Sequence, residues 1–303
     1  MTKERGRVAT LHRLGELAGR IREAVGALER CEVCPRRCGV DRTRGELGVC
    51  GIGRLARVAS AAPHFGEERP LVGTRGSGAI FLSGCSLRCS FCQNCEISHT
   101  AIGRETDAAD LAGIMLELQS HGCLNINLVT PSHVVPQILE ALPIAIDGGL
   151  SIPIVYNTSG YDALETLRLL DGVVDIYMPD LKFWHGEGAE LMDGVTDYAA
   201  VAVDAIREMH RQVGDLHLVA GIAVSGVLVR HLVMPGDVAD AAAIMRFLAS
   251  VSPETYVNIM SQYRPFHDAR HHPEIGRSVT YVEHAKAIEA AHDAGLRRVH
   301  GHL

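Results

Sequence analysis

Three cysteines with the spacing C-x3-C-x2-C, namely Cys85, Cys89 and Cys92, are the side chains in this sequence most suited to chemistry. They follow an apolar run, residues 78–83, which predicts a buried strand with the thiols on the loop at its C-terminal end. Iron–sulfur clusters are held by cysteine thiolates, and three ligands to a cluster of four irons leave one iron without a protein ligand. The spacing therefore predicts a [4Fe-4S] cluster with one iron open to a substrate or cofactor.

A zinc site is the alternative interpretation of these thiols. Cys92 and Cys95 have the C-x2-C spacing of half a zinc knuckle. Zinc ribbons usually contain two knuckles of similar spacing, and this favours the cluster at residues 85–92. A fourth thiolate on the open iron would block the binding of a cofactor, so Cys95 is predicted to be a free thiol.

A second set of cysteines precedes the first, with the spacing C-x2-C-x3-C-x11-C. Its members are Cys31, Cys34, Cys38 and Cys50. Four thiolates close a coordination sphere, which is typical of a structural zinc ion or an auxiliary iron–sulfur cluster. Glycines and a proline beside these cysteines indicate tight turns, and this favours a metal site over unligated thiols. The spacing does not separate zinc from iron.

Length, charge and cysteine usage limit the class of protein. A chain of 303 residues is long enough for one barrel-sized domain or two smaller ones, and we expect one. The formal net charge of -7 at pH 7 argues against a general nucleic-acid binder, which needs a basic surface. Most of the nine cysteines are clustered, which suits metal ligation in a reducing compartment. We therefore expect a cytoplasmic protein without a nucleic-acid partner.

The sequence predicts neither a signal peptide nor a membrane span. No apolar segment follows the polar residues 1–5. The longest apolar run, residues 219–229, contains serine and glycine and is too short to cross a bilayer. We therefore expect this run to belong to the core and the protein to have no membrane partner.

Strands and helices alternate from residue 78 onward, which is typical of a parallel sheet covered by helices. The predicted strands are residues 78–83, 125–129, 152–156, 174–178, 227–233 and 255–259. The predicted helices are residues 107–119, 132–145, 162–170, 195–212, 238–250 and 282–294, preceded by an amphipathic helix at 10–30. We therefore expect an α/β fold at residues 76–303, preceded at residues 1–75 by a small cysteine-rich module with an N-terminal helix and a four-cysteine metal site.

Each predicted strand ends in polar residues, and parallel strands bring such ends to one edge of the sheet. The candidate binding residues there are Thr130, Asn157, Ser159, Asp180, Lys182, Arg230 and His231. Arg230 and His231 are neighbours and point to opposite faces of their strand, so only one of them can enter the site. Two long polar loops, residues 183–193 and 264–277, are candidate lids or substrate loops.

Histidines gather in two further places. His267, His271 and His272 could bind a metal, but a solvated histidine-rich loop is the favoured interpretation. His300 and His302 are expected in a frayed C-terminal tail.

The thiols and the strand-end residues together resemble the radical S-adenosylmethionine (radical SAM) superfamily. With the C-x3-C-x2-C motif, residues 157–161, 174–182, 230–235 and 260–263 are similar to the pyruvate formate-lyase activating enzyme group, and within it to the PflX-like branch. The similarity extends from about residue 31 to the C-terminus. It implies a partial (β/α)6 TIM-type barrel with its chemistry at the C-terminal ends of the strands.

In that superfamily the open iron binds the amino and carboxylate groups of S-adenosylmethionine (SAM), and reduction cleaves the sulfonium to give a 5′-deoxyadenosyl radical. The resemblance implies that Phe91 lies against the adenine, and that Asp180 and Lys182 hold the amino acid part of SAM. Asn157 and Ser159 match residues that line the same pocket. Residues 127–131, which include Thr130, replace the Gly-Gly-Glu motif of the family.

The resemblance implies a radical SAM oxidoreductase that abstracts a hydrogen atom from its substrate and receives electrons from flavodoxin or ferredoxin. Three functions stay open. The one we favour is an activase that forms a glycyl radical on a partner protein. The others are an enzyme that acts on a small molecule or peptide, and a non-catalytic iron–sulfur redox or sensor protein.

Overall fold

The computed structural model describes residues 7–189 and 191–301, which form a mixed sheet of ten strands flanked by helices. The strand order is β10-β9-β8-β6-β5-β4-β2-β1-β3, and β7 pairs with β8. The parallel strands are β2 (Ser77–Leu82), β4 (Ile126–Val129), β5 (Ile154–Thr158), β6 (Ile176–Pro179), β8 (Ile222–Leu232), β9 (Tyr256–Met260) and β10 (Arg298–His300). The antiparallel strands are β1 (Ala56–His64), β3 (Arg104–Thr106) and β7 (His217–Val219).

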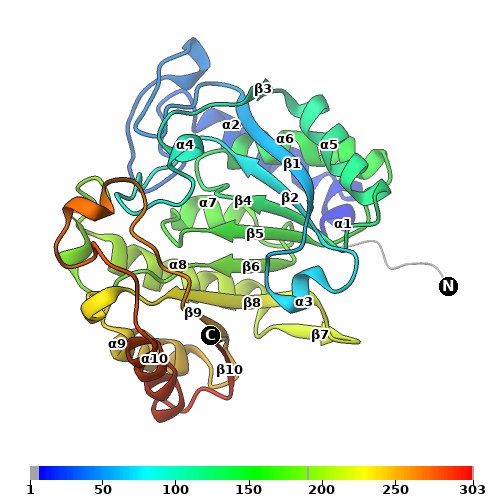
Figure 1. Ribbon diagram of the computed structural model, residues 1–303. Coiled ribbons are helices and arrows are strands. Elements are labelled where there is room, and N and C mark those ends of the chain that lie inside the picture. Colours follow the sequence, from blue (N-terminus) through cyan, green and yellow to red (C-terminus); the bar gives the residue numbers. More distant parts are fainter. Residues whose placement is uncertain (1–6, 190, 302–303) are drawn as a thin grey trace.

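Helices follow the parallel strands in the chain and lie along the sheet (Figure 1). The longer ones are α5 (Ala108–Ser120), α6 (Val135–Asp147), α7 (Leu164–Leu169), α8 (Tyr198–Val213), α9 (Ala241–Val251) and α10 (Tyr281–Asp293). The short ones are α3 (Arg69–Val72), α4 (Cys95–Ser98) and the 3-10 turns η1 (Arg42–Arg44), η2 (Gly186–Ala189), η3 (Pro235–Asp237) and η4 (His267–His271). Side chains begin several of them: the Asp107 carboxylate caps α5, and a capping box of Thr280 and Glu283 begins α10. The α/β class is confirmed.

The six predicted strands and the six helices after them are all present, with shifted ends. The largest shift is in β8, which begins at Ile222 rather than at residue 227. The sequence analysis missed β1, whose small residues and proline have low strand propensity and whose second half is exposed. Because β1 pairs with β2, the sheet begins before residue 76, and the predicted boundary at 75/76 runs through it.

The predicted helix at 10–30 is two helices, α1 (Arg7–Arg13) and α2 (Glu16–Gly26). Gly15 between them has φ +75°, a left-handed conformation that a continuous α-helix cannot contain. The break lets α2 pack against α6 and α7 on the helical side of the sheet.

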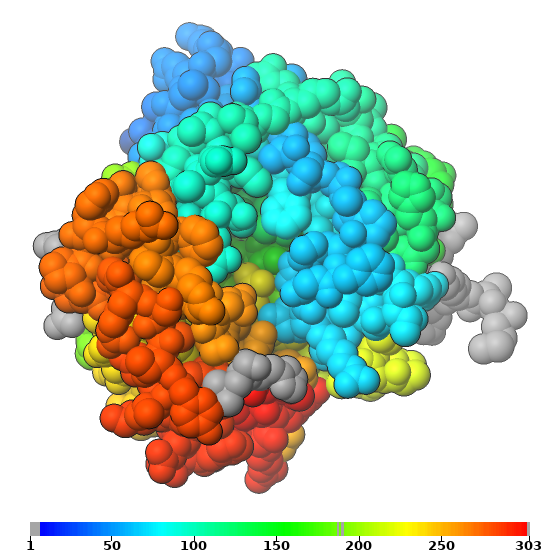
Figure 2. Space-filling model, in the orientation of Figure 1, coloured from blue at the N-terminus to red at the C-terminus, as the bar shows by residue number. Residues whose placement is uncertain are grey.

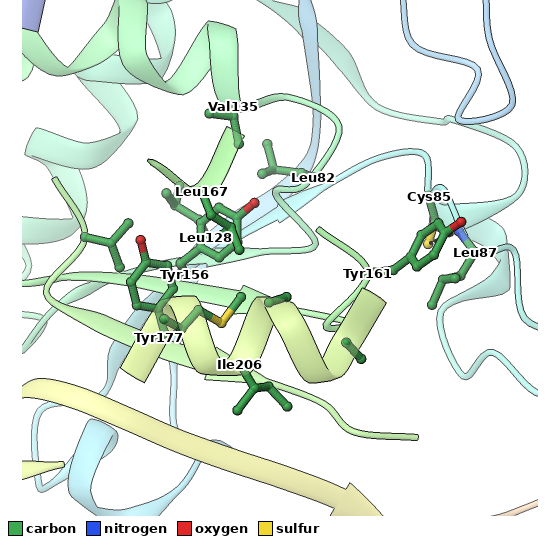
Figure 3. Close-up of a cluster of buried hydrophobic side chains, with 14 of the residues drawn as sticks. Leu82, Cys85, Leu87, Leu128, Val135, Tyr156, Tyr161, Leu167, Tyr177 and Ile206 are labelled. Carbon is green, nitrogen blue, oxygen red and sulfur yellow. Dashed lines mark hydrogen bonds between the residues drawn. The ribbon is translucent and has the colours of Figure 1, made fainter. Parts of the chain in front are cut away.

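The two faces of the sheet bury different cores. Tyr156 and Tyr177 belong to the larger core, which the long helices cover (Figure 3). The residues before them in the chain, Val155 and Ile176, point the other way and pack with Leu71 of α3 in a smaller core. Residues that continue this second face toward the C-terminal ends of the strands are therefore available to a site there.

The C-terminal segment is ordered further than predicted. Strand β10 pairs with β9, and the ring of His300 stacks on that of Tyr256 with centroids 4.1 Å apart, so His300 does not lie in a frayed tail. His302 lies outside the described residues. None of the helices in the described ranges has both the length and the apolar character that a membrane crossing requires.

Candidate functional site

A cavity of about 440 Å³ lies at the C-terminal ends of β2, β4, β5, β6, β8 and β9. Figure 2 shows a hollow near the centre of the view, where green and yellow atoms are visible between the cyan and orange surfaces. Of the residues predicted for the cluster and cofactor site, all except His231 line this cavity: Cys85, Cys89, Phe91, Cys92, Thr130, Asn157, Ser159, Asp180, Lys182 and Arg230. A second cavity, of about 380 Å³ beside α9 and α10, is lined by none of them.

The three thiols come from the loop that follows β2. Cys85 and Cys89 are buried and Cys92 is partly buried. The Leu87 N–H donates to Cys85 Sγ at 3.4 Å, and the Ser98 hydroxyl lies 3.2 Å from Cys92 Sγ. Burial raises the pKa of both Cys89 and Cys92. A buried thiolate therefore needs a positive centre beside it, which an iron cluster would supply.

In the described residues, no group of three or more cysteine, histidine, aspartate or glutamate side chains is arranged to hold a metal ion. The chemistry of the donor atoms, rather than their present arrangement, is therefore what favours an iron–sulfur cluster here. The donors on the cavity wall are three thiols from one loop, with a backbone N–H beside Cys85 Sγ and a hydroxyl beside Cys92 Sγ, and this donor set fits an iron–sulfur cluster. Cys95 begins α4 and is not among the residues that line the cavity.

On the same cavity wall, Arg230 connects three elements. Its Nε donates to Asp180 Oδ1 at 2.8 Å and its Nη2 to Asn157 Oδ1 at 2.8 Å. Its Nη1 lies 3.4 Å from Glu67 Oε2. Lys182 Nζ donates to the second oxygen of Asp180 at 2.6 Å. Both oxygens of Asp180 therefore already have a cationic partner.

These contacts and the burial of the site shift the pKa values of its charged residues. Burial alone would raise the pKa of Asp180, but Arg230 and Lys182 outweigh it and the pKa is lowered. Burial would likewise lower the pKa of Lys182, but the charge of Asp180 reverses this. For Glu67 burial prevails over Arg230, and the pKa is raised. Lys182 has N–H donors beyond the one that Asp180 accepts, so it can receive a ligand carboxylate while this ion pair stays closed.

Of the two neighbours Arg230 and His231, Arg230 is the one that faces the cavity. His231 does not line it: the imidazole is fully buried on the opposite face of β8, where Nδ1 lies 2.9 Å from the Leu181 carbonyl oxygen. Alternation along the strand is the reason, and His231 is therefore withdrawn as a cofactor-binding residue.

Phe91 links the thiol loop to both predicted polar loops. Its ring lies 5.9 Å from that of Phe183 and 6.3 Å from that of Tyr263, measured between centroids. Phe183 is the first residue of the loop at 183–193, and Tyr263 directly precedes the loop at 264–277, so one end of each loop lies near the thiol loop. The second loop also contacts the site edge through His267, whose ring centroid is 4.7 Å from that of His99.

Sequence reasoning missed Glu67 and His64, which also line the cavity. His64 ends β1, and Glu67 lies in the connection from β1 to α3. Because β1 was not predicted, the residues at its end could not be recognised as strand-end residues. Thr130 was predicted as a binding residue, but its backbone conformation was not predicted. Its φ is +60°, which is strained for a β-branched residue. Strain of this kind is frequent at functional sites.

The four N-terminal cysteines also lie close together. Burial raises the pKa of Cys34 to about 12, and the neighbouring Cys50, Cys31 and Cys38 add to this. The Val49 N–H donates to Cys38 Sγ at 3.5 Å. Four thiols near one another, with a backbone donor on one sulfur, are a donor set that fits either zinc or an iron–sulfur cluster.

The two cysteine sets are in contact. Arg36 Nε, beside Cys34, donates to the Ser86 carbonyl oxygen at 2.7 Å, and Arg88 Nη1 donates to that of Val49 at 3.4 Å. Gly84 also lies so close to the backbone of Cys50 that a Cβ atom on Gly84 would clash with the Cys50 carbonyl oxygen. The loop of the first set therefore rests on the turn of the second.

Gly84→Ala is expected to lower the free energy of unfolding by about 3 kcal/mol, because it adds this clash to the strain of φ +81°. Gly122→Ala is the matched control, since Gly122 has φ +87° but open space around its Cβ position. The control should lose only about 1 kcal/mol. Urea unfolding of both variants measures the difference, and equal losses would show that the close approach to Cys50 is unimportant.

No family model matches the sequence. A curated protein of Methanocaldococcus jannaschii, described as the uncharacterized protein MJ0674, is 32% identical over 281 residues. The alignment covers 90% of this chain and 77% of that protein.

Proposed function

This chain belongs to the same protein family as MJ0674 of Methanocaldococcus jannaschii, and we propose that it is a radical SAM enzyme. One observation carries the proposal. The three thiols, an aromatic ring and a buried group of charged residues line one cavity at the C-terminal ends of parallel strands. A volume of about 440 Å³ lies in the range of small-molecule and cofactor sites.

In this proposal Cys85, Cys89 and Cys92 hold a [4Fe-4S] cluster and leave one iron for SAM. When bound, cluster and SAM supply the reductive cleavage that produces a 5′-deoxyadenosyl radical for hydrogen abstraction. The chain itself positions the cofactor and shields it from water. The finer fold description belongs to the same proposal: the parallel strands β2, β4, β5, β6, β8 and β9 would form a partial (β/α)6 barrel behind a cysteine-rich N-terminal module.

The charged group can bind both ends of an amino acid. Lys182 would receive the carboxylate of the methionine part, using its free N–H donors. Asp180 would share its oxygens with the ammonium group, while Arg230, itself held by Asn157, keeps the Asp180 carboxylate in place. Phe91 would lie against the adenine, with Thr130 and Ser159 lining the remaining wall.

For the substrate we propose a partner protein or peptide on which a hydrogen atom is abstracted. The cavity opens to the surface (Figure 2), and the first of the two predicted polar loops begins at Phe183 and the second directly after Tyr263, two residues that pack against Phe91 of the cavity wall. One-electron reduction would come from flavodoxin or ferredoxin. A small substrate that the same loops enclose is the alternative, and the following experiment distinguishes the two.

The protein is reconstituted with iron and sulfide without oxygen, then reduced and incubated with unlabelled SAM and fractionated, deuterated cell extract. We expect 5′-deoxyadenosine to form, and we expect deuterium in it only with the high-molecular-weight fraction. Deuterium arising only from the low-molecular-weight fraction would exclude a protein partner. If a reconstituted, reduced protein forms no 5′-deoxyadenosine under any of these conditions, the radical SAM proposal is wrong.

A further inference from the structure

Arg42 is a fully buried cation beside the N-terminal cysteines. Its Nε and Nη2 donate to the Gly53 carbonyl oxygen at 3.1 and 2.9 Å, and its Nη1 donates to that of His133 at 2.8 Å. Nη1 also lies 3.8 Å from Cys31 Sγ. Among the described residues, no aspartate or glutamate forms an ion pair with Arg42, in contrast to Arg230 in the cavity.

A buried charge without a counter-charge is strongly destabilising. Carbonyl oxygens orient the guanidinium but do not neutralise it. In the part of the chain that the structure describes, the thiol of Cys31 is the group near Arg42 that can carry negative charge.

A four-thiolate metal centre would supply the missing charge. Four thiolates outweigh the charge of a zinc ion or of an oxidised iron–sulfur cluster, so either centre is a net anion, whereas four neutral thiols are not. Carbonyl oxygens on both sides hold the guanidinium in place next to this site. His133 in turn connects Arg42 to the end of β2, because its Nε2 lies 2.8 Å from the Ser83 carbonyl oxygen.

We propose that Arg42 is the counter-ion of an anionic metal centre held by Cys31, Cys34, Cys38 and Cys50, and that its charge is needed to retain the metal. This inference rests on the proposed function and on the four-cysteine metal site that the sequence predicts in its N-terminal module. It assigns Arg42 a positioning and electrostatic role, because the guanidinium would contact a ligand sulfur rather than the metal.

Metal retention tests the proposal in a background where Cys85, Cys89 and Cys92 are alanine, so that only the second site contributes. Zinc and iron are quantified per chain, and their release to a chelator is timed without oxygen. Arg42→Met should release the metal at least tenfold faster than the parent, while Arg42→Lys should retain it better than Arg42→Met. Arg54→Met is the control, since Arg54 has its own carboxylate partner in Glu140 at 2.8 Å and should release metal at the parent's rate.

A thermal double-mutant cycle separates charge balance from packing. Arg42→Met should lower Tm clearly in the parent, because the metal centre loses its counter-ion. It should lower Tm less, or raise it, when the four N-terminal cysteines are alanine, because the removed cation then has no partner. If Arg42→Met does not fold, the same cycle is run with Arg42→Gln, which also removes the charge.

Equal Tm losses in both backgrounds, or unchanged release from a folded Arg42→Met variant, would overturn the counter-ion role and leave the second metal site standing. A parent with neither zinc nor iron would overturn both. The cavity cluster is judged separately by formation of 5′-deoxyadenosine, so the failure of one proposal can be distinguished from that of the other.

Discussion

Replacing Cys85, Cys89 and Cys92 together by alanine is expected to abolish the cavity cluster and all formation of 5′-deoxyadenosine from SAM. The three thiols line one cavity, and in the proposed function they are the protein ligands of that cluster. The measurement is iron and sulfide content per chain, the visible absorption of the anaerobically reconstituted protein, and chromatography of the reaction products. Part of the iron will remain if the N-terminal site also holds a cluster, so product formation is the decisive readout.

Two cysteines outside the cavity wall provide controls. Cys95→Ala changes the thiol nearest to the motif, and Cys123→Ala changes a buried thiol of the core. Both variants should keep the cluster and the product. If Cys95→Ala lost the cluster as completely as the triple variant, Cys95 would be a fourth ligand and the iron open to SAM would not exist. A triple variant that still produced 5′-deoxyadenosine would refute the assignment of the motif.

Asp180→Ala is expected to weaken SAM binding by about 30-fold, equivalent to about 2 kcal/mol, without loss of the cluster. Its carboxylate is the shared partner of Arg230 and Lys182, so its removal leaves two buried cations facing each other and removes the acceptor for the ammonium group of SAM. Lys182→Met should weaken binding similarly by removing the donor for the SAM carboxylate. Equilibrium dialysis of SAM on the reconstituted proteins measures the affinities.

Glu140→Ala is the matched control for the Asp180→Ala and Lys182→Met variants. It removes the carboxylate of another arginine ion pair, Arg54–Glu140, whose residues do not line the cavity. SAM affinity should be unchanged, and any general loss of stability from breaking an ion pair would be visible here. If Asp180→Ala and Lys182→Met bound SAM as tightly as the parent, the Asp-Leu-Lys motif would have no part in the site.

Local patterns were sufficient to predict the elements that build the cavity. Apolar runs flanked by helical periodicity predicted β2, β4, β5, β6, β8 and β9, because a strand buried on both faces has a continuous apolar sequence. The rule that parallel strands end at one edge then predicted that Asn157, Asp180 and Arg230 lie together, as they do.

Local patterns failed where a conformation depends on a distant partner. Strand β1 has low strand propensity and exists because β2 and β3 pair with it, and Glu67 enters the cavity only as a consequence. The break at Gly15 was invisible because the apolar spacing continues across it, whereas packing of α2 on α6 requires it.

The sequence by itself determined which residue types could do chemistry and in which order along the chain they meet the sheet edge, since spacing and alternation are local properties. Only the tertiary structure decided that Arg230 rather than His231 faces the cavity, that Gly84 rests on the Cys50 turn, and that Arg42 is buried beside Cys31 without a carboxylate partner among the described residues. These facts concern distances between segments that are far apart in the chain. They follow from close packing of backbone and side chains, which no local pattern contains.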